Sequence, residues 1–167
     1  IYRQLLSQDQ KRAEKIVKEE FIVCVKEIIF WPDGVNEEFY QMIYRILQHS
    51  KNGKVNRSGV SGIHLYNKDK IKITKIIKSN HETGIFEAEI EVLNDRTGKY
   101  VKKEGSSSFF PVDWGLQRLI LECFEAFNNK IEIDKFTYHG ITTNGIKLEF
   151  VYDGKKVFKS VYPILDL

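Results

Sequence analysis

The chain has 167 residues, of which 42% are hydrophobic and 29% charged, and its formal net charge is +3. This length and composition predict one globular domain with a core of its own and exclude a disordered chain. The apolar runs are shorter than the roughly 20 residues that cross a bilayer, and the charged start is unlike a signal peptide, so no membrane-inserted segment is expected.

Helical spacing of apolar residues dominates the first part of the chain. Between residues 3 and 30 apolar positions recur at this spacing among many charged ones, which predicts one or two amphipathic packing helices. After a Phe-Trp-Pro-Asp-Gly break, Asn36 begins a second helical pattern that ends near His49. A helix C-terminus stabilises a cation, so this position is expected to raise the pKa of His49. We divide the chain into an N-terminal helical segment, residues 1–35, and a single unit, residues 36–167.

A polar, glycine-rich loop with a histidine near each end lies at residues 48–66. His49 and His64 are two of the four histidines in the chain, and a pair of imidazoles can supply one proton donor and one acceptor near neutral pH. Between Lys51 and Lys78 the sequence contains eight cationic side chains and a single acidic one, Asp69. This local basic field favours an anionic substrate, and we interpret the stretch as an active-site loop of a phosphodiester-cleaving protein.

Alternating apolar and polar residues predict antiparallel strands after this loop. The expected strands are residues 70–77, 85–92 and 99–104. His81 falls in the turn between the first two and is expected to be a solvated turn residue.

A helix and a second set of strands are expected next. Asp113 can cap a helix whose apolar face includes Cys123, and residues 136–167 alternate between glycine-containing turns. Cys24 and Cys123 lack metal-ligand spacing and are expected to be buried free thiols, and no zinc site is expected. The predicted fold class is α+β, with N-terminal helices followed by antiparallel sheets and one flanking helix.

Several ordered motifs between His49 and Pro163 resemble the EndoU endoribonucleases, and within them the bacterial toxin domains of polymorphic and contact-dependent growth inhibition systems. The motifs are H-S-K-N-G-K-V-N-R-S-G-V-S-G-I-H (49–64), G-I-F-E-A-E-I (84–90), K-K-E-G-S-S-S-F-F-P-V-D-W (102–114), G-I-T-T-N-G-I (140–146) and S-V-Y-P-I (160–164). The resemblance implies antiparallel sheets flanked by helices, an architecture shared by barnase, EndoU, colicin and RelE-type nucleases.

The resemblance also implies roles for individual residues. His64 would be the general base that takes the proton from the ribose 2′-hydroxyl, and His49 the general acid that protonates the leaving 5′-oxygen. Lys103 would stabilise the charge that develops on the phosphate, with Lys102 as its rival for this role.

The remaining site residues follow from the same resemblance and from the basic loop. Ser160 and Tyr162 match a Ser-x-Tyr pattern that positions the nucleotide. The residues expected to contact substrate are Lys51, Lys54, Arg57, Lys102, Ser107 and Thr142.

Cleavage of RNA, metal-independent or stimulated by Mn²⁺, is the activity that the resemblance implies. A base, an acid and a cation are sufficient for attack of a 2′-hydroxyl on its own phosphate, which gives a 2′,3′-cyclic phosphate and a 5′-hydroxyl. One alternative is a non-catalytic RNA- or protein-binding module of the same fold. A metal-dependent nuclease is disfavoured, because no pair of carboxylates lies near the two histidines in the sequence.

A toxin of this kind implies particular partners and a particular location. The expected substrate is RNA, with tRNA as the first candidate, and the expected inhibitor is an acidic immunity protein. Because the chain begins at Ile1 without methionine, we expect it to be the C-terminal piece of a larger secreted protein. The piece would be a secreted or surface-delivered effector that acts in the cytoplasm of a target cell.

Overall fold

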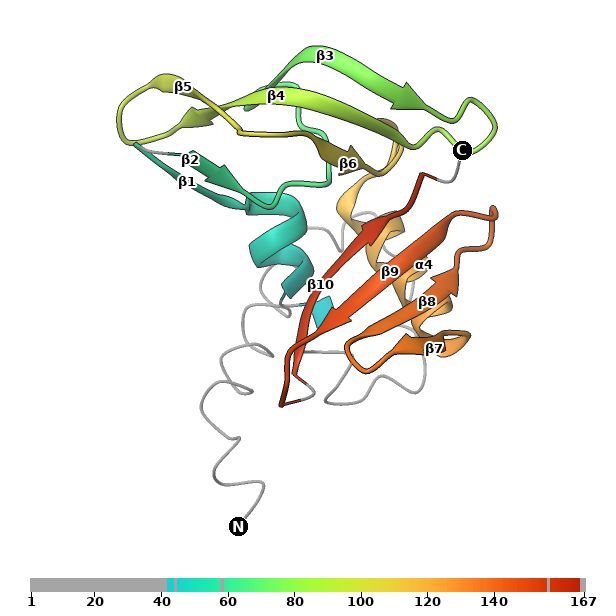
Figure 1. The fold of residues 1–167 in the computed structure, drawn as a ribbon. Coiled ribbons are helices and arrows are strands. Elements are labelled where there is room, and N and C mark those ends of the chain that lie inside the picture. Colours follow the sequence, from blue (N-terminus) through green and yellow to red (C-terminus); the bar gives the residue numbers. More distant parts are fainter. Residues whose placement is uncertain (1–41, 44, 58, 156, 166–167) are drawn as a thin grey trace.

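A computed structural model describes residues 42–165 except 44, 58 and 156. Figure 1 shows this part as two larger antiparallel sheets and a small two-stranded one, with a helix behind the lower large sheet and a short helical segment between the two large sheets. The mixed α+β class expected from the sequence is confirmed for these residues. The helices expected in residues 1–35, and the start of the helix expected from Asn36, lie outside the described residues.

The first sheet contains a strand at each of the three places predicted from the alternating patterns. It contains β3 (Ile71–Ser79), β4 (Phe86–Asn94) and β5 (Lys99–Lys102), and β6 (Ser107–Phe109) pairs with β4 beside β5. Every second residue of β4 is buried, because this strand lies between neighbours and turns one face to the core. Ser107, which was expected to contact substrate, pairs with Ala88 in this sheet and is buried.

The second sheet is built by the end of the chain and carries the long helix on one face. Its strands are β7 (Ile131–Asp134), β8 (Thr137–Ile141), β9 (Lys147–Tyr152) and β10 (Phe158–Pro163), in the spatial order β10-β9-β8-β7. The helix α4 (Leu116–Asn128) lies behind it (Figure 1). A Cβ atom on Gly140 would collide with the carbonyl of Ala126, so a glycine allows this close approach.

The cap predicted for this helix is wrong. Gly115 is the N-cap and makes no side-chain capping bond, whereas Asp113 lies two residues earlier. The amide of Trp114 donates to the carbonyl of Pro111 at 3.0 Å, so a turn after the proline occupies the position where the helix was expected to begin.

The histidine loop contains more regular structure than its glycines suggested. A π-helical segment, η1 (Ile46–Asn52), carries His49 in its last turn, and β1 (Lys54–Asn56) and β2 (Gly59–Ser61) form a small hairpin after it. The hydroxyl of Ser50 donates to the carbonyl of Val161 at 3.3 Å, which joins η1 to β10.

Two buried clusters flank the segment that contains His64. One joins α4, the second sheet and η1, and the other lies under the first sheet. The aromatic residues Phe109, Phe110 and Trp114 belong to these clusters and are at most 4% exposed. Cys123 is a buried free thiol, as predicted, while Cys24 lies outside the described residues. No helix in the described part is both long and apolar enough to cross a bilayer.

Candidate active site

A cavity of about 640 Å³ brings the two sheets, η1 and the histidine loop together. It is lined by His49, Gly62, His64, Glu87, Lys103, Ser106, Ser107, Ser108, His139, Glu149 and residues 162–165. The two imidazole rings are 5.3 Å apart between centroids. Residues that lie more than a hundred positions apart in the sequence therefore meet in one open hollow.

Main-chain hydrogen bonds hold the two histidines at this separation. The amide of Ile63 donates to the carbonyl of His49, and the amide of His64 donates to that of Ser50, both at 2.7 Å. On the other side, the carbonyl of His64 accepts from the amide of Phe110 at 2.9 Å. These main-chain hydrogen bonds, on both sides of His64, therefore fix the positions of the two histidines.

The turn before His64 has an unusual backbone. Gly62 and Ile63 have φ of 76° and 72°. Among the residues that the structure describes, Ile63 alone has a positive φ without being a glycine. A β-branched residue in this conformation costs on the order of 1–3 kcal/mol. At Gly62 a Cβ atom would collide with the carbonyl of His49 and lie 3.1 Å from its Nδ1 atom. The glycine therefore permits the contact that brings the two ends of the loop together.

His64 is held as a neutral imidazole with one nitrogen committed. Its Nδ1 atom lies 2.7 Å from the carbonyl oxygen of Ser108, and because a carbonyl only accepts, Nδ1 carries the hydrogen. The Nε2 atom of the neutral ring then keeps its lone pair. Burial lowers the pKa of His64 to about 3; the Ser108 carbonyl raises it, and the charges of His49 and Lys103 lower it further. His64 is suited to accept a proton at neutral pH.

The pKa expectation for His49 is wrong in sign. Its pKa is lowered from its ordinary value, first by burial and then by the positive charges of Lys103 and Arg45. His49 does lie at the end of a helical segment, as predicted, but partial burial and two cations outweigh the helix terminus. A bound phosphate would oppose both cations, because a nearby negative charge favours the protonated imidazole.

Lys103 points into the cavity, and Lys102 does not. The Lys103 ammonium donates to the carbonyl of Gly62 at 2.8 Å and to the hydroxyl of Ser107. Burial lowers the pKa of this amine. Lys102 is exposed on β5 opposite Glu91. Since an ammonium has three donors, the two described bonds leave one N–H for an anion in the cavity.

Tyr162 lines the cavity beside His64. Its ring stacks with that of His64, with centroids 5.6 Å apart and an interplanar angle of 27°. Ser160, two residues earlier on β10, is half-buried opposite Val151 and is not among the residues that line the cavity. The structure therefore brings Tyr162 to the histidines but leaves Ser160 further along the strand.

A hydrogen-bonded pair of side chains in the cavity was not predicted from the sequence. His139 on β8 and Glu149 on β9 are a quarter exposed or less, and the His139 Nε2 atom lies 3.1 Å from Glu149 Oε1. The Tyr162 hydroxyl donates to Glu149 Oε2. Their outward positions in alternating strands were visible in the sequence, but the pairing register that aligns them with Tyr162 was not.

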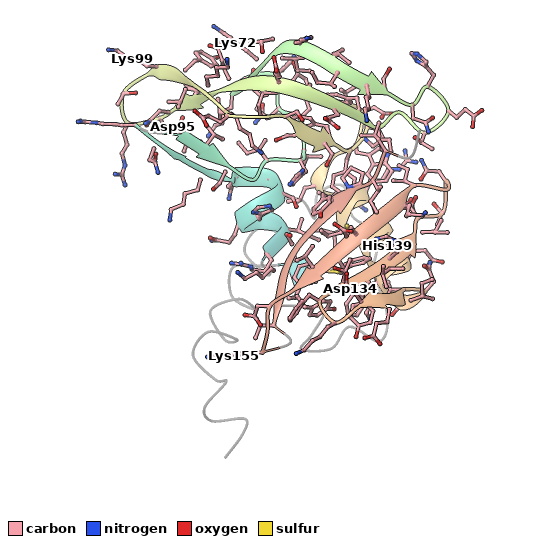
Figure 2. The ribbon with its side chains drawn as sticks, in the orientation of Figure 1. Lys72, Asp95, Lys99, Asp134, His139 and Lys155 are labelled. Atoms are coloured by element: carbon pink, nitrogen blue, oxygen red, sulfur yellow. The ribbon has the colours of Figure 1, made fainter. Side chains whose placement is uncertain are left out.

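A second, larger hollow of about 1080 Å³ contains part of the expected RNA-binding surface. Its charged lining residues are Lys51, Lys54, Lys68, Asp69, Lys70, Asp95 and Arg96. The Lys70 ammonium and the Asp95 carboxylate form an exposed ion pair of 3.1 Å, at the end of the first sheet where Figure 2 labels Asp95. Both hollows adjoin η1 and the 62–63 turn, because His49 and Gly62 line one and Lys51 and Ile63 the other.

The remaining expected contacts lie apart from both hollows. Arg57 is exposed near the turn of the β1–β2 hairpin. Thr142 is buried in the turn between β8 and β9, where its hydroxyl contacts Asn144 and accepts from the amide of Ile146 at 3.0 Å. Among the described residues, there is no group of three or more His, Cys, Asp or Glu side chains that could hold a metal ion.

Comparison with known proteins gives the family. A sequence model described as bacterial EndoU nuclease matches residues 44–165, which contain the entire cavity. The chain belongs to the bacterial EndoU nuclease family. It is also 33% identical, over 125 residues, to a protein of Bacillus cereus named "Toxin"; the match covers 70% of this chain and 22% of that protein. No solved structure matches the chain.

Proposed function

We propose that this EndoU domain is an endoribonuclease toxin that cleaves RNA by attack of a ribose 2′-hydroxyl on the adjacent phosphate, without requiring a metal ion. The observation that supports it best is the convergence of His49, His64, Lys103 and Tyr162 on one open cavity. A base, an acid and a phosphate-stabilising cation are the groups that this reaction needs.

The proton transfers follow from the state of each histidine. His64 Nε2 takes the proton of the 2′-hydroxyl as the O2′–P bond forms. His49, protonated when phosphate is bound, gives its proton to the 5′-oxygen as the P–O5′ bond breaks. The products are a 2′,3′-cyclic phosphate and a 5′-hydroxyl, and no group of the protein becomes covalently attached.

The charge of the transition state falls on the nonbridging phosphate oxygens. Lys103 is anchored by Gly62 and Ser107, so its third N–H is already oriented when the substrate arrives. A donor fixed in this way stabilises developing charge without reorganisation during the reaction, which is where such groups have their largest effect.

We assign the nucleotide to the Tyr162 wall and the flanking RNA to the second hollow. An aromatic ring provides a stacking surface for a base, and the second hollow has five cations against two acids along its lining. Substitution of Lys54 by alanine is expected to weaken RNA binding and to reduce its salt dependence without changing the rate of bound RNA. Binding isotherms at several salt concentrations, beside single-turnover rates, measure the two effects separately.

The toxin assignment rests on the relative. The matched region spans about a fifth of the Bacillus cereus toxin, so delivery, target and partners of such a protein are inferred for this chain. We infer a delivered effector that cleaves cellular RNA, such as tRNA, in a target cell, and a neutralising protein in the cell that makes it.

Incubation of the purified chain with total RNA tests the activity. Cleavage in EDTA, with fragments whose 5′ ends accept phosphate from a kinase directly and whose 3′ ends resist phosphatase until the cyclic phosphate is opened, supports the proposal. A single 2′-deoxy nucleotide at the cleaved position should block the reaction. RNA binding without cleavage would favour the non-catalytic module instead, and cleavage only after return of a metal would contradict the metal-independent mechanism.

A further inference from the structure

A row of side chains crosses the second sheet from its edge to the active site. In the strand register Ile131 pairs with His139, His139 with Glu149, and Glu149 with Tyr162. Partners in adjacent antiparallel strands point to the same face of a sheet, so all four lie on the face away from α4. Figure 2 labels His139 on this open face.

Hydrogen bonds join three side chains of this row, His139, Glu149 and Tyr162, and lead to the cavity that contains the two histidines. His139 Nε2 donates to Glu149 Oε1 at 3.1 Å, because a carboxylate only accepts, and the Tyr162 hydroxyl donates to Glu149 Oε2. The Tyr162 ring in turn stacks with that of His64 at 5.6 Å. Glu149 thus bridges His139 and Tyr162, and the Tyr162 ring contacts His64, the proposed general base.

The direction of these bonds determines what Tyr162 presents to a ligand. Its phenolic hydrogen is committed to Glu149, so toward a ligand in the cavity the phenolic oxygen can act only as an acceptor. His139 holds the other oxygen of the same carboxylate, which leaves Glu149 less freedom to rotate away. We infer that Glu149 and His139 are positioning residues that act on the substrate through Tyr162, fixing its ring against His64 and making it an acceptor for an N–H or O–H of the bound nucleotide.

This inference rests on the proposed RNA cleavage and makes its own prediction. Glu149→Ala should lower kcat/KM by roughly 10- to 100-fold, since small displacements of a positioning group cost up to about that much. Glu149→Gln should keep most of the activity, because its amide oxygen still accepts the tyrosine hydrogen. His139→Ala should cause a smaller loss than Glu149→Ala.

A double-mutant cycle with Tyr162→Phe separates positioning from a general structural role. If Glu149 acts through the hydroxyl, adding Glu149→Ala to Tyr162→Phe should cause less than about a twofold further loss, because the group that it holds is already gone. Glu132→Ala removes an exposed carboxylate from β7 in the same sheet and should leave activity unchanged. Melting temperatures of all variants report whether the fold is intact.

Several outcomes would overturn the inference. Full activity of Glu149→Ala, or losses that multiply in the double variant, would show that Glu149 does not work through Tyr162. If Glu149→Ala does not fold, Glu149→Leu, which keeps the side-chain bulk, replaces it in the cycle. An inactive wild-type chain would overturn the proposed function together with this inference, whereas active wild type with multiplying losses would overturn this inference alone.

Discussion

His49 and His64 lie with their rings 5.3 Å apart although fourteen residues separate them in the chain, and the hydrogen bond from the amide of Ile63 to the carbonyl of His49 closes the loop between them. The two rings differ in environment. His64 is 8% exposed and bonded to a backbone carbonyl, whereas His49 is half-buried beside two cations. This difference suits His64 and His49 to the two proposed proton transfers, in which one imidazole accepts a proton and the other donates one.

The two roles can be separated by the leaving group. His49→Ala and His64→Ala should each lower the rate by about 10²–10⁴-fold on ordinary RNA. A substrate with sulfur in place of the bridging 5′-oxygen leaves as a thiolate, which needs no proton. It should therefore restore cleavage by His49→Ala but not by His64→Ala.

His81→Ala is the matched control for these variants, because His81 is exposed in the turn between β3 and β4 and should be dispensable. Rescue of the His64 variant instead of the His49 variant would reverse the two assignments.

The two adjacent lysines offer a similar internal comparison. Lys103→Ala should lower the rate of bound RNA by about 10²–10³-fold, because it removes an oriented donor from the cavity. Lys102→Ala removes the same charge from an exposed position of β5 and should change the rate little. Single-turnover kinetics at saturating enzyme measure this step, and a larger loss for Lys102→Ala would exchange the roles of the two residues.

Some of this site could be predicted from the sequence and some could not. The two histidines, Lys103, Ser107 and Tyr162 were expected from ordered motifs, and all five line the same cavity. Local motifs do not specify which strands become neighbours or in which register, and that is why His139 and Glu149 were missed.

The fold shows the same division between local and long-range information. Strands β3 and β4 follow from alternation, which is a property of a few consecutive residues. The lowered pKa of His49 could not be predicted from the sequence, because it depends on burial and on the charges of Lys103 and Arg45, which come close only in the folded chain. Thr142 shows the converse, since its motif was recognised but the structure uses its hydroxyl within a turn.

The low pKa of His64 makes stability depend on pH. The folded chain holds this imidazole neutral down to a pKa of about 3, whereas in the unfolded chain it protonates near its ordinary value of 6.5. The unfolded state therefore binds more protons below about pH 6.5, and stability should fall as the pH is lowered through this range.

His64→Asn removes this titration and should flatten the dependence. At about pH 4.5 the loss due to His64 should approach 3 kcal/mol on the order-of-magnitude scale of 1.36 kcal/mol per pKa unit. Urea denaturation of both proteins at pH 7 and at about pH 4.5 measures the difference, in which the contribution of His49 cancels. Equal changes in the two proteins would mean that His64 is not held neutral by the fold.

Gly62 should be intolerant of even the smallest side chain. Gly62→Ala places a methyl group against the carbonyl of His49 at a positive φ, so we expect a loss of roughly 1–3 kcal/mol in stability and about 100-fold in activity. Gly59→Ala is the matched control in the same loop, because its Cβ would have no atom within 4 Å and its φ lies outside the positive range. Calorimetry and cleavage assays on the two variants test this, and an active, stable Gly62→Ala protein would contradict the described turn.

The proposed neutralising partner should be acidic where it covers the active site. The cavity contains Lys103 and the proposed catalytic pair His49 and His64, and the second hollow next to it is lined by more cations than acids, so a negative surface would both fit and approach quickly. Its association rate should fall as salt screens the opposed charges, and Lys54→Ala should slow association more than dissociation. Coexpression of the chain with the gene next to its own, followed by stopped-flow binding and RNA cleavage assays on the complex, measures each point. A tightly bound partner that leaves cleavage intact would contradict a footprint over the cavity.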